Sequence, residues 1–111
     1  MRDIMKASPE YLHFIMDKLS PINGIRSRAM FGGYGIFCGD SMFALIAEDT
    51  LYFKVNESNR AVYKKAQSKP FPHGISYWEV PAEVIEEDSK LLDWANLSIE
   101  IARSIPKKRS K

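Results

Sequence analysis

The chain has 111 residues, of which 45% are hydrophobic and 27% charged, so we expect one globular domain that buries its own core. A single cysteine, Cys38, excludes an internal disulfide and a cysteine-based metal cluster, and it is typical of a reducing, cytoplasmic compartment. The N-terminus lacks the apolar stretch of a signal peptide, and no apolar run approaches the roughly 18 residues of a membrane span.

The net charge of +2 is unevenly distributed. Residues 107–111 hold four of the 16 basic residues, which leaves 12 basic against 14 acidic residues, a net charge of −2, in the rest of the chain. We therefore expect residues 1–106 to form the single domain and residues 107–111 to be a disordered basic tail. Such a tail weakly favours any polyanion, although a solvated chain end is the simpler interpretation.

The first predicted element is a helix over residues 9–19. Ser8 is a good N-cap and Pro9 a good first helical residue, and Pro21 ends the pattern. Apolar residues spaced by three and four positions give the helix one buried face: Leu12, Ile15, Met16 and Leu19.

Residues 25–30 are predicted to form a first strand or an extended entry, and strands are predicted at residues 34–38, 42–47 and 51–55. Their short polar connections predict an antiparallel meander. Strict alternation divides the two central stretches into one face with Met42, Ala44, Ile46, Leu51, Phe53 and Val55 and another with Phe43, Leu45, Tyr52 and Lys54. The second face predicts either a groove or a partner contact, including homodimerisation through Phe43, Leu45 and Tyr52.

In the second half, a helix is predicted over residues 57–67, with Ala61, Val62 and Ala66 inward. A proline loop, a strand over residues 75–80 and a short helical turn over residues 82–87 come next. The last helix covers residues 89–104 and turns Leu91, Trp94, Ala95, Ala102 and Ile105 inward, with Leu97 and Ile101 beside them. Adjacent strands with helices around them predict an α+β fold.

Three glycines in four positions, Gly32-Gly33-Tyr34-Gly35, suggest a phosphate-binding loop at first sight. Such a loop needs a helix N-terminus directly after it, whereas here an aromatic strand follows. We therefore expect a strained or bulged backbone that another element approaches closely, or a recognition surface.

No catalytic or metal-binding constellation is evident. His13 and His73 are 60 positions apart and lack a carboxylate or cysteine at ligand spacing. Cys38 lies in a predicted strand, where a buried, inert cysteine is the usual case.

Ten of the 13 aromatic residues fall between Phe31 and Trp78. Next to Arg28, Lys54 and Arg60 they suggest a surface that stacks single-stranded nucleic acid, although core or interface packing explains most of the rings. A further alternative is a small-ligand site, which requires a closed apolar pocket beside Phe31 and Trp78.

Five motifs in order give the chain a family resemblance over about residues 10–105. They are Arg28–Phe37, Met42–Ala47, Leu51–Asn56, Asn59-Arg60 and Ser76–Pro81. The sequence resembles the N-terminal domain of the TfoX/Sxy family. That resemblance implies a curved antiparallel sheet flanked by helices, similar to the type III secretion chaperone-like fold.

The resemblance also implies a function. Members are bacterial, cytoplasmic, positive regulators of transcription of the competence genes for DNA uptake, and they act with the cyclic-AMP receptor protein. It implies neither an enzymatic activity nor a cofactor. Longer members carry a second, helical domain, so this chain is expected to be a stand-alone or truncated form.

We predict an interaction patch around the glycine stretch. Lys54 ends one predicted strand and Arg60 starts the next helix, so we expect Arg28, Tyr34, Lys54 and Arg60 to lie near one another. The full predicted patch is Arg28, Gly32, Gly33, Tyr34, Lys54, Asn59, Arg60 and Trp78.

Overall fold

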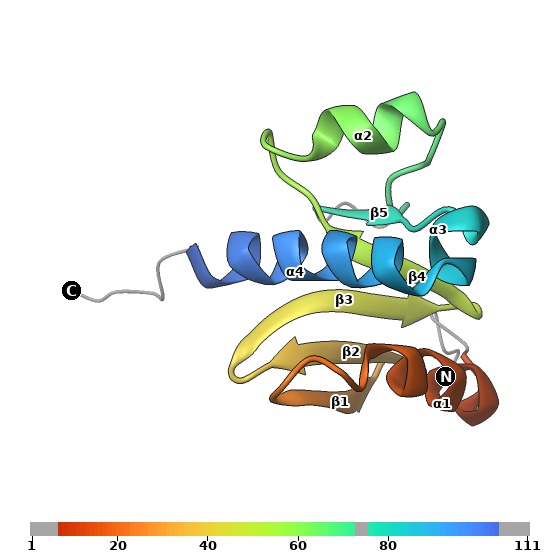
Figure 1. Ribbon diagram of the computed structural model, residues 1–111. Helices are drawn as coiled ribbons and strands as arrows, with labels where there is room; N and C mark the ends of the chain where they lie inside the picture. The colour runs from red at the N-terminus through yellow and green to blue at the C-terminus, as the bar shows by residue number, and fades with distance from the viewer. Residues whose placement is uncertain (1–6, 73–75, 105–111) are drawn as a thin grey trace.

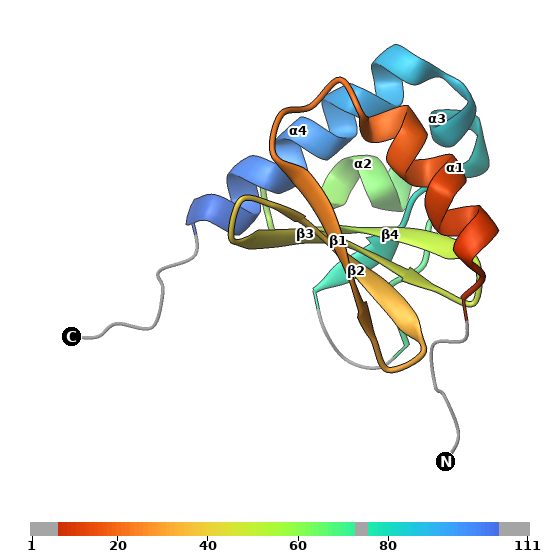
Figure 2. The same ribbon diagram turned by 90° about the horizontal axis from the view of Figure 1, so that it is seen from below.

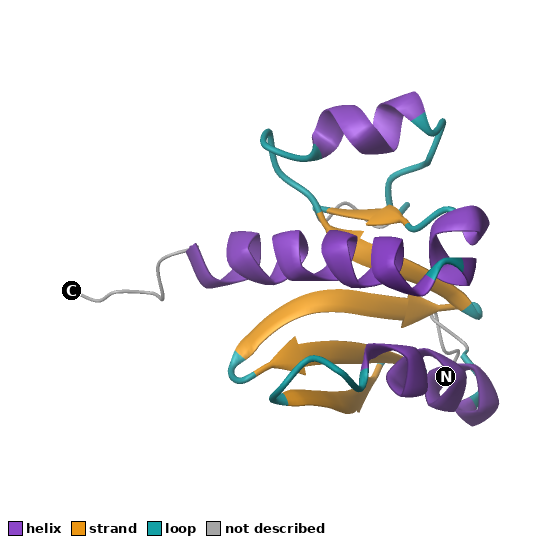
Figure 3. Ribbon diagram, in the orientation of Figure 1, coloured by secondary structure: helices purple, strands orange, loops and turns teal. Residues whose placement is uncertain are grey.

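The computed structural model describes residues 7–72 and 76–104, which form a five-stranded antiparallel sheet and four helices (Figures 1 and 3). This is the α+β architecture that the sequence predicts. The strands follow one another across the sheet in chain order, as expected for a meander. They are β1 (Ile25–Met30), β2 (Gly33–Cys38), β3 (Ser41–Ala47), β4 (Thr50–Lys54) and β5 (Tyr77–Glu79).

All four helices lie on one side of the sheet (Figure 2). They are α1 (Pro9–Leu19), α2 (Arg60–Lys65), α3 (Ala82–Glu86) and α4 (Asp88–Ser104), and α4 crosses β3 and β4. Within the described residues, no helix has the length and apolar character needed to cross a membrane. The start of α1 is confirmed, because the Ser8 hydroxyl accepts a hydrogen bond from the Tyr11 N–H at 3.2 Å.

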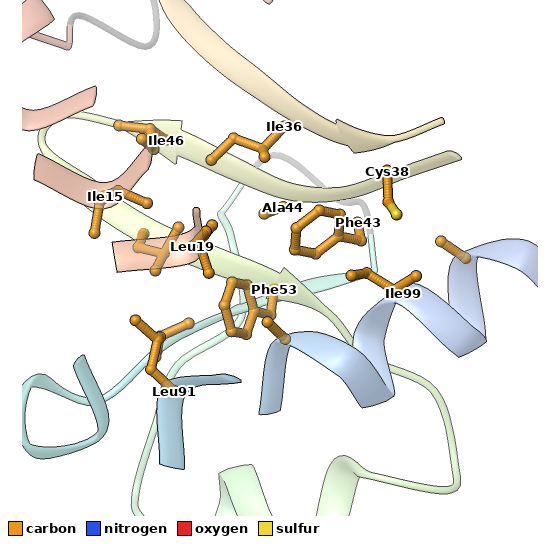
Figure 4. Close-up of a cluster of buried hydrophobic side chains, with 14 of the residues drawn as sticks. Ile15, Leu19, Ile36, Cys38, Phe43, Ala44, Ile46, Phe53, Leu91 and Ile99 are labelled. Carbon is orange, nitrogen blue, oxygen red and sulfur yellow. The ribbon is translucent and has the colours of Figure 1, made fainter. Parts of the chain in front are cut away.

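The main core fills the space between the helices and the sheet (Figure 4). Ile15 and Leu19 of α1 and Leu91 of α4 are fully buried there, as their helical spacing predicts. They pack against apolar side chains from the three central strands, among them Ile36, Phe43, Ala44, Ile46 and Phe53.

A β-bulge in β3 corrects the predicted division of the two faces. Ile36 pairs with Ala44 but the next residue, Phe37, pairs with Met42, so Phe43 is the extra residue. Phe43 and Ala44 therefore both enter the main core, and Met42 moves to the opposite face. Strict alternation had placed Met42 on the face of Ala44 and Phe43 on the face of Leu45, and both assignments are wrong.

The face of the sheet that lacks helices, here called the open face, carries a second, smaller core. Phe71 reaches this face from the segment after α2, and its ring meets that of Tyr52 edge-on at 5.0 Å. Leu45 and Tyr77 are buried beside it. Of the three residues that motivated a homodimer contact, Phe43 and Leu45 are thus internal, and homodimerisation stays a prediction.

Helix α2 is shorter than predicted, and its inward face is different. Tyr63 is the buried side chain of α2, whereas Ala61 and Val62 are exposed. The Tyr63 ring packs against Trp94 at 4.7 Å and Trp78 at 6.4 Å, which decides the orientation of the helix.

The last helix begins at Asp88, and its buried face includes the predicted Leu91, Ala95 and Ala102. Ser98 and Ile99 are also buried there, which the sequence did not indicate. Ile105 and the basic tail lie outside the described residues.

The bulge predicts unequal costs for two neighbouring truncations. Phe43→Ala should lower the free energy of unfolding by about 3–5 kcal/mol, because it empties a core position that is 0% exposed. Met42→Ala should cost about 1 kcal/mol, because Met42 is only half-buried on the open face. Urea denaturation of the two variants measures both values, and equal costs would contradict the bulge.

Candidate functional site

The glycine stretch forms the hairpin that joins β1 to β2. Met30 pairs with Gly33, so Phe31 and Gly32 make a two-residue turn, with φ angles of 51° and 85°. Left-handed backbone at both positions is what a tight hairpin requires. Phe31 is 71% exposed at the tip. The stretch therefore continues into a strand, and it does not start a helix that could hold a phosphate.

Gly35 explains the close approach that the sequence predicts. It pairs with Arg28 on one side and Leu45 on the other. A Cβ atom at Gly35 would lie 2.9 Å from the Met42 sulfur and 3.0 Å from the Met30 methyl group. The glycine thus leaves room for two methionine side chains that cover this part of the open face.

Two arginines on β1 flank one aromatic ring on β2. The guanidinium carbons of Arg26 and Arg28 each lie 5.9 Å from the centre of the Phe37 ring. Together with Ser27 these side chains line a recess of about 230 Å³. We call Arg26, Arg28 and Phe37 the hairpin surface. Arg26 was missed in the sequence, although its spacing of two from Arg28 places both on one face of a strand.

The two arginines differ in their electrostatic partners. The Arg26 Nη2 lies 3.6 Å from the Asp40 Oδ1, and its Nε donates to the Gly39 carbonyl at 3.2 Å. Both members of this ion pair are exposed, so it contributes little to stability. No described residue forms an ion pair with Arg28. Arg28 is therefore the more available cation of the hairpin surface.

The Lys54 carbonyl, the Asn59 side chain and the Ser98 hydroxyl form a buried hydrogen-bonded cluster, here called the polar junction. The Lys54 carbonyl accepts hydrogen bonds from the Asn59 Nδ2 at 3.2 Å and from the Ser98 hydroxyl at 2.7 Å. The Asn59 Oδ1 in turn accepts from the Asn56 N–H at 2.9 Å. The Lys54 ammonium lies 5.0 Å from the centre of the Tyr77 ring on the open face, and partial burial lowers its pKa.

The predicted patch does not exist as one surface. Arg28 is on β1, at one edge of the sheet, whereas Arg60 begins α2, which lies beyond β5 at the other end of the molecule (Figure 1). Lys54 is three strands from Arg28, about 14 Å at about 4.8 Å per strand. Tyr34 and Trp78 pack on the helix-covered face. The predicted proximity of Arg28 to Lys54 and Arg60 is wrong, because chain neighbours of Lys54 are not spatial neighbours of β1. Tyr34 does lie on the strand beside Arg28, where it pairs with Ala29.

A small cavity lies between α2 and α4. Its volume is about 180 Å³, below the roughly 300 Å³ at which ligand pockets usually begin. The Tyr63 hydroxyl is buried beside it without a hydrogen bond from the described residues. Burial raises the Tyr63 pKa well above its ordinary value, and the neighbouring Ser98 hydroxyl offsets this only in part. The cavity is lined by Asn59, Val62, Tyr63, Asp93, Trp94 and Leu97.

The lone cysteine is part of the packing between β2 and α4. Its thiol donates to the Asn23 carbonyl at 3.4 Å and accepts from the Arg103 Nη2 at 3.3 Å. His13 is exposed on α1, and His73 lies outside the described residues. Within residues 7–72 and 76–104, no group of three or more His, Cys, Asp or Glu side chains is arranged to hold a metal ion.

A family model described as the TfoX N-terminal domain matches residues 17–102. The chain belongs to the TfoX N-terminal domain family. The match runs from the second half of α1 almost to the end of α4, so this TfoX-type domain has its hairpin surface and its polar junction inside the matched region. A comparison with curated proteins found no match.

The polar junction predicts different roles for two adjacent residues of the predicted patch. Asn59→Ala should lower the free energy of unfolding by about 1–3 kcal/mol, because the Asn56 N–H loses its acceptor in a half-buried site. Arg60→Ala should change it by about 0.5 kcal/mol or less, because Arg60 is exposed. Chemical denaturation of both variants measures the difference, and an equally large loss for Arg60→Ala would contradict this assignment.

Buried tyrosines predict a loss of stability in alkali. Burial raises the pKa of Tyr77 from 10.0 to about 12, and its hydroxyl donates to the Met42 carbonyl at 3.1 Å. The folded state holds the Tyr77 proton more tightly than the unfolded state does. The contribution of protonated Tyr77 to the free energy of unfolding is therefore complete below pH 10 and is lost as the pH rises toward 12. The free energy of unfolding should fall by about 1–3 kcal/mol over that range. Tyr77→Phe should flatten the decline, and an unchanged slope would contradict it.

Proposed function

We propose that this chain is a non-enzymatic interaction domain that supports positive regulation of competence-gene transcription through contact with a protein partner. Family resemblance implies the cyclic-AMP receptor protein as that partner. The observation that carries the proposal is the hairpin surface. It presents two cationic groups and an aromatic ring on an exposed hairpin, inside the region that defines the family.

The composition of the hairpin surface suits a protein contact. Arginine and aromatic residues are enriched at the energetic centres of protein interfaces, where a planar cation and a ring bury much area at low entropic cost. Arg28 has no ion-pair partner among the described residues, so a carboxylate from another protein can pair with it at no loss to the fold.

Direct nucleic-acid binding is the second candidate, and the contact of Arg26 and Arg28 with Phe37 favours it. Against it, most rings that suggested a stacking platform point elsewhere. Phe43 and Phe53 are in the main core, and Tyr52 meets Phe71 edge-on. On the hairpin itself, Phe37 is half-buried beneath the two guanidinium groups, and Phe31 at the tip is exposed.

The test is a binding measurement with purified cyclic-AMP receptor protein, in the presence of cyclic AMP, by biolayer interferometry. Arg28→Ala should weaken binding by at least about tenfold, the scale of a lost charge-assisted contact. Arg60→Ala is the matched control, because it removes the same charge from an exposed site at the other end of the molecule. It should bind within about twofold of the wild type.

Two outcomes would count against the proposal. No binding of the wild type to the receptor protein, with or without a competence-promoter fragment, removes this partner. A shift of the DNA fragment by the chain alone, lost on Arg28→Ala and weakening steeply with salt, favours the nucleic-acid function instead.

A further inference from the structure

The two edges of the sheet differ in how their backbone groups are satisfied. The outer edge of β5 is covered by the segment after α2. The Glu79 N–H donates to the Lys69 carbonyl at 2.9 Å, the Phe71 N–H donates to the Tyr77 carbonyl at 2.7 Å, and the Ser68 hydroxyl donates to the Glu79 carbonyl. No described residue pairs with the outer edge of β1 (Figures 1 and 2). The sheet therefore has one open edge among its described strands.

The turn geometry identifies which groups of β1 are free. A tight turn is closed by a hydrogen-bonded pair, here Met30 and Gly33, and hydrogen-bonded and non-bonded pairs then alternate along the ladder. Arg28 and Arg26 consequently point their backbone groups at β2. Ser27 and Ala29 point their N–H and C=O groups away from it, and both residues are exposed.

The arginines disfavour a second copy of this chain on that edge. An antiparallel β1–β1 contact centred on Ser27 would set Arg26 opposite Arg28 of the other copy. Centring the contact on Arg26 would set Arg26 opposite its own copy, and centring it on Arg28 would do the same for Arg28. Like charges directly opposed on one face destabilise a strand pair, and charged edge residues are a common protection against self-association.

The same charges favour an acidic strand. An added strand would place every second side chain on the open face, beside the recess between Arg26, Arg28 and Phe37. Acidic side chains at those positions would lie opposite the guanidinium groups. Arg28 has no ion-pair partner among the described residues. The ion pair of Arg26 with Asp40 is exposed and can be exchanged, while the Arg26 Nε keeps its hydrogen bond to the Gly39 carbonyl.

We propose that β1 accepts, as an additional antiparallel strand, an extended segment of a protein partner with acidic side chains at alternate positions. Backbone groups of Ser27 and Ala29 supply the pairing, and Arg26 and Arg28 supply the preference for acidic residues. This inference rests on the proposed function and specifies the chemistry of the partner at the hairpin surface.

The probe is a labelled synthetic peptide of alternating Glu and Val, with a peptide of the same composition and clustered Glu residues as control. Fluorescence anisotropy should show binding of the alternating peptide and no binding of the clustered control peptide. Arg28→Glu should weaken it at least about tenfold, and Arg60→Glu, which makes the same charge change on α2, should leave it within about twofold.

Ala29→Pro tests the backbone pairing itself. Proline at Ala29 removes an N–H that points away from β2, so the β1–β2 ladder keeps its hydrogen bonds while the outer edge is blocked. This variant should unfold at the wild-type temperature and bind the peptide at least about tenfold more weakly. Equal affinity of Ala29→Pro and the wild type would overturn strand addition.

Methylated peptides give an independent measurement on the wild-type protein, should the proline variant not fold. In an antiparallel addition the Val N–H groups face β1 and the Glu N–H groups face solvent. Methylation of the Val amides should abolish binding and methylation of the Glu amides should not, and the reverse would indicate parallel addition. Equal affinities for the two methylated peptides overturn the proposal.

The receptor-protein assay separates this inference from the proposed function. Binding of the receptor protein that depends on Arg28 but not on Ala29→Pro would keep the hairpin surface as a contact and reject strand addition. Displacement of the bound peptide by single-stranded DNA at equal charge concentration, with no effect of Ala29→Pro on either ligand, would reassign the surface to nucleic acid.

Discussion

The extra residue in β3 sets what each face of the sheet presents. Because Phe43 has no partner on β2, the strand turns two successive side chains, Phe43 and Ala44, into the main core. Met42 is then forced to the open face, where with Met30 it covers Gly35. The bare glycine and the displaced methionine depend on each other, since a side chain at Gly35 would occupy the space of the Met42 sulfur.

A second constraint fixes the other end of the molecule. The Lys54 carbonyl, at the last residue of β4, is shared by Asn59 before α2 and Ser98 on α4. One backbone acceptor thus joins a strand and two helices inside a poorly hydrated region, where an unmet donor is costly. The neighbouring Tyr63 ring fills the space between Trp78 and Trp94. This end is built for packing, and the hairpin end keeps its charges exposed.

Local signals in the sequence were sufficient for elements and connections. Ser8-Pro9 and an apolar stripe define α1, and short turns between β-rich stretches define the meander. The sequence was insufficient to predict features that depend on contacts with elements far along the chain. Nothing in Met42-Phe43 marks a bulge, because the bulge follows from how β2 and α4 pack around it. The inward face of α2 depends on two tryptophans that lie far along the chain.

The candidate site shows the same division. The glycine stretch marked unusual backbone at the right place, and glycine chemistry accounts for the left-handed conformation of Gly32 but not for that of Phe31. Arg60 was wrongly joined to it because closeness to Lys54 in the chain was taken for closeness to Arg28 in space. The spacing of two between Arg26 and Arg28 could have predicted that both lie on one face of a strand. That shared face matters for recognition only because β1 is an edge strand, which the sequence did not show.

An edge strand with two arginines has to satisfy two demands at once. Free N–H and C=O groups attract any extended chain, and the charges at Arg26 and Arg28 repel those that are basic or identical. The positive charge of Arg26 and Arg28 repels a basic strand and attracts an acidic one. A feature that keeps this chain from pairing with itself therefore also selects the charge of whatever pairs with it, so protection of the edge and recognition at the edge need no separate residues.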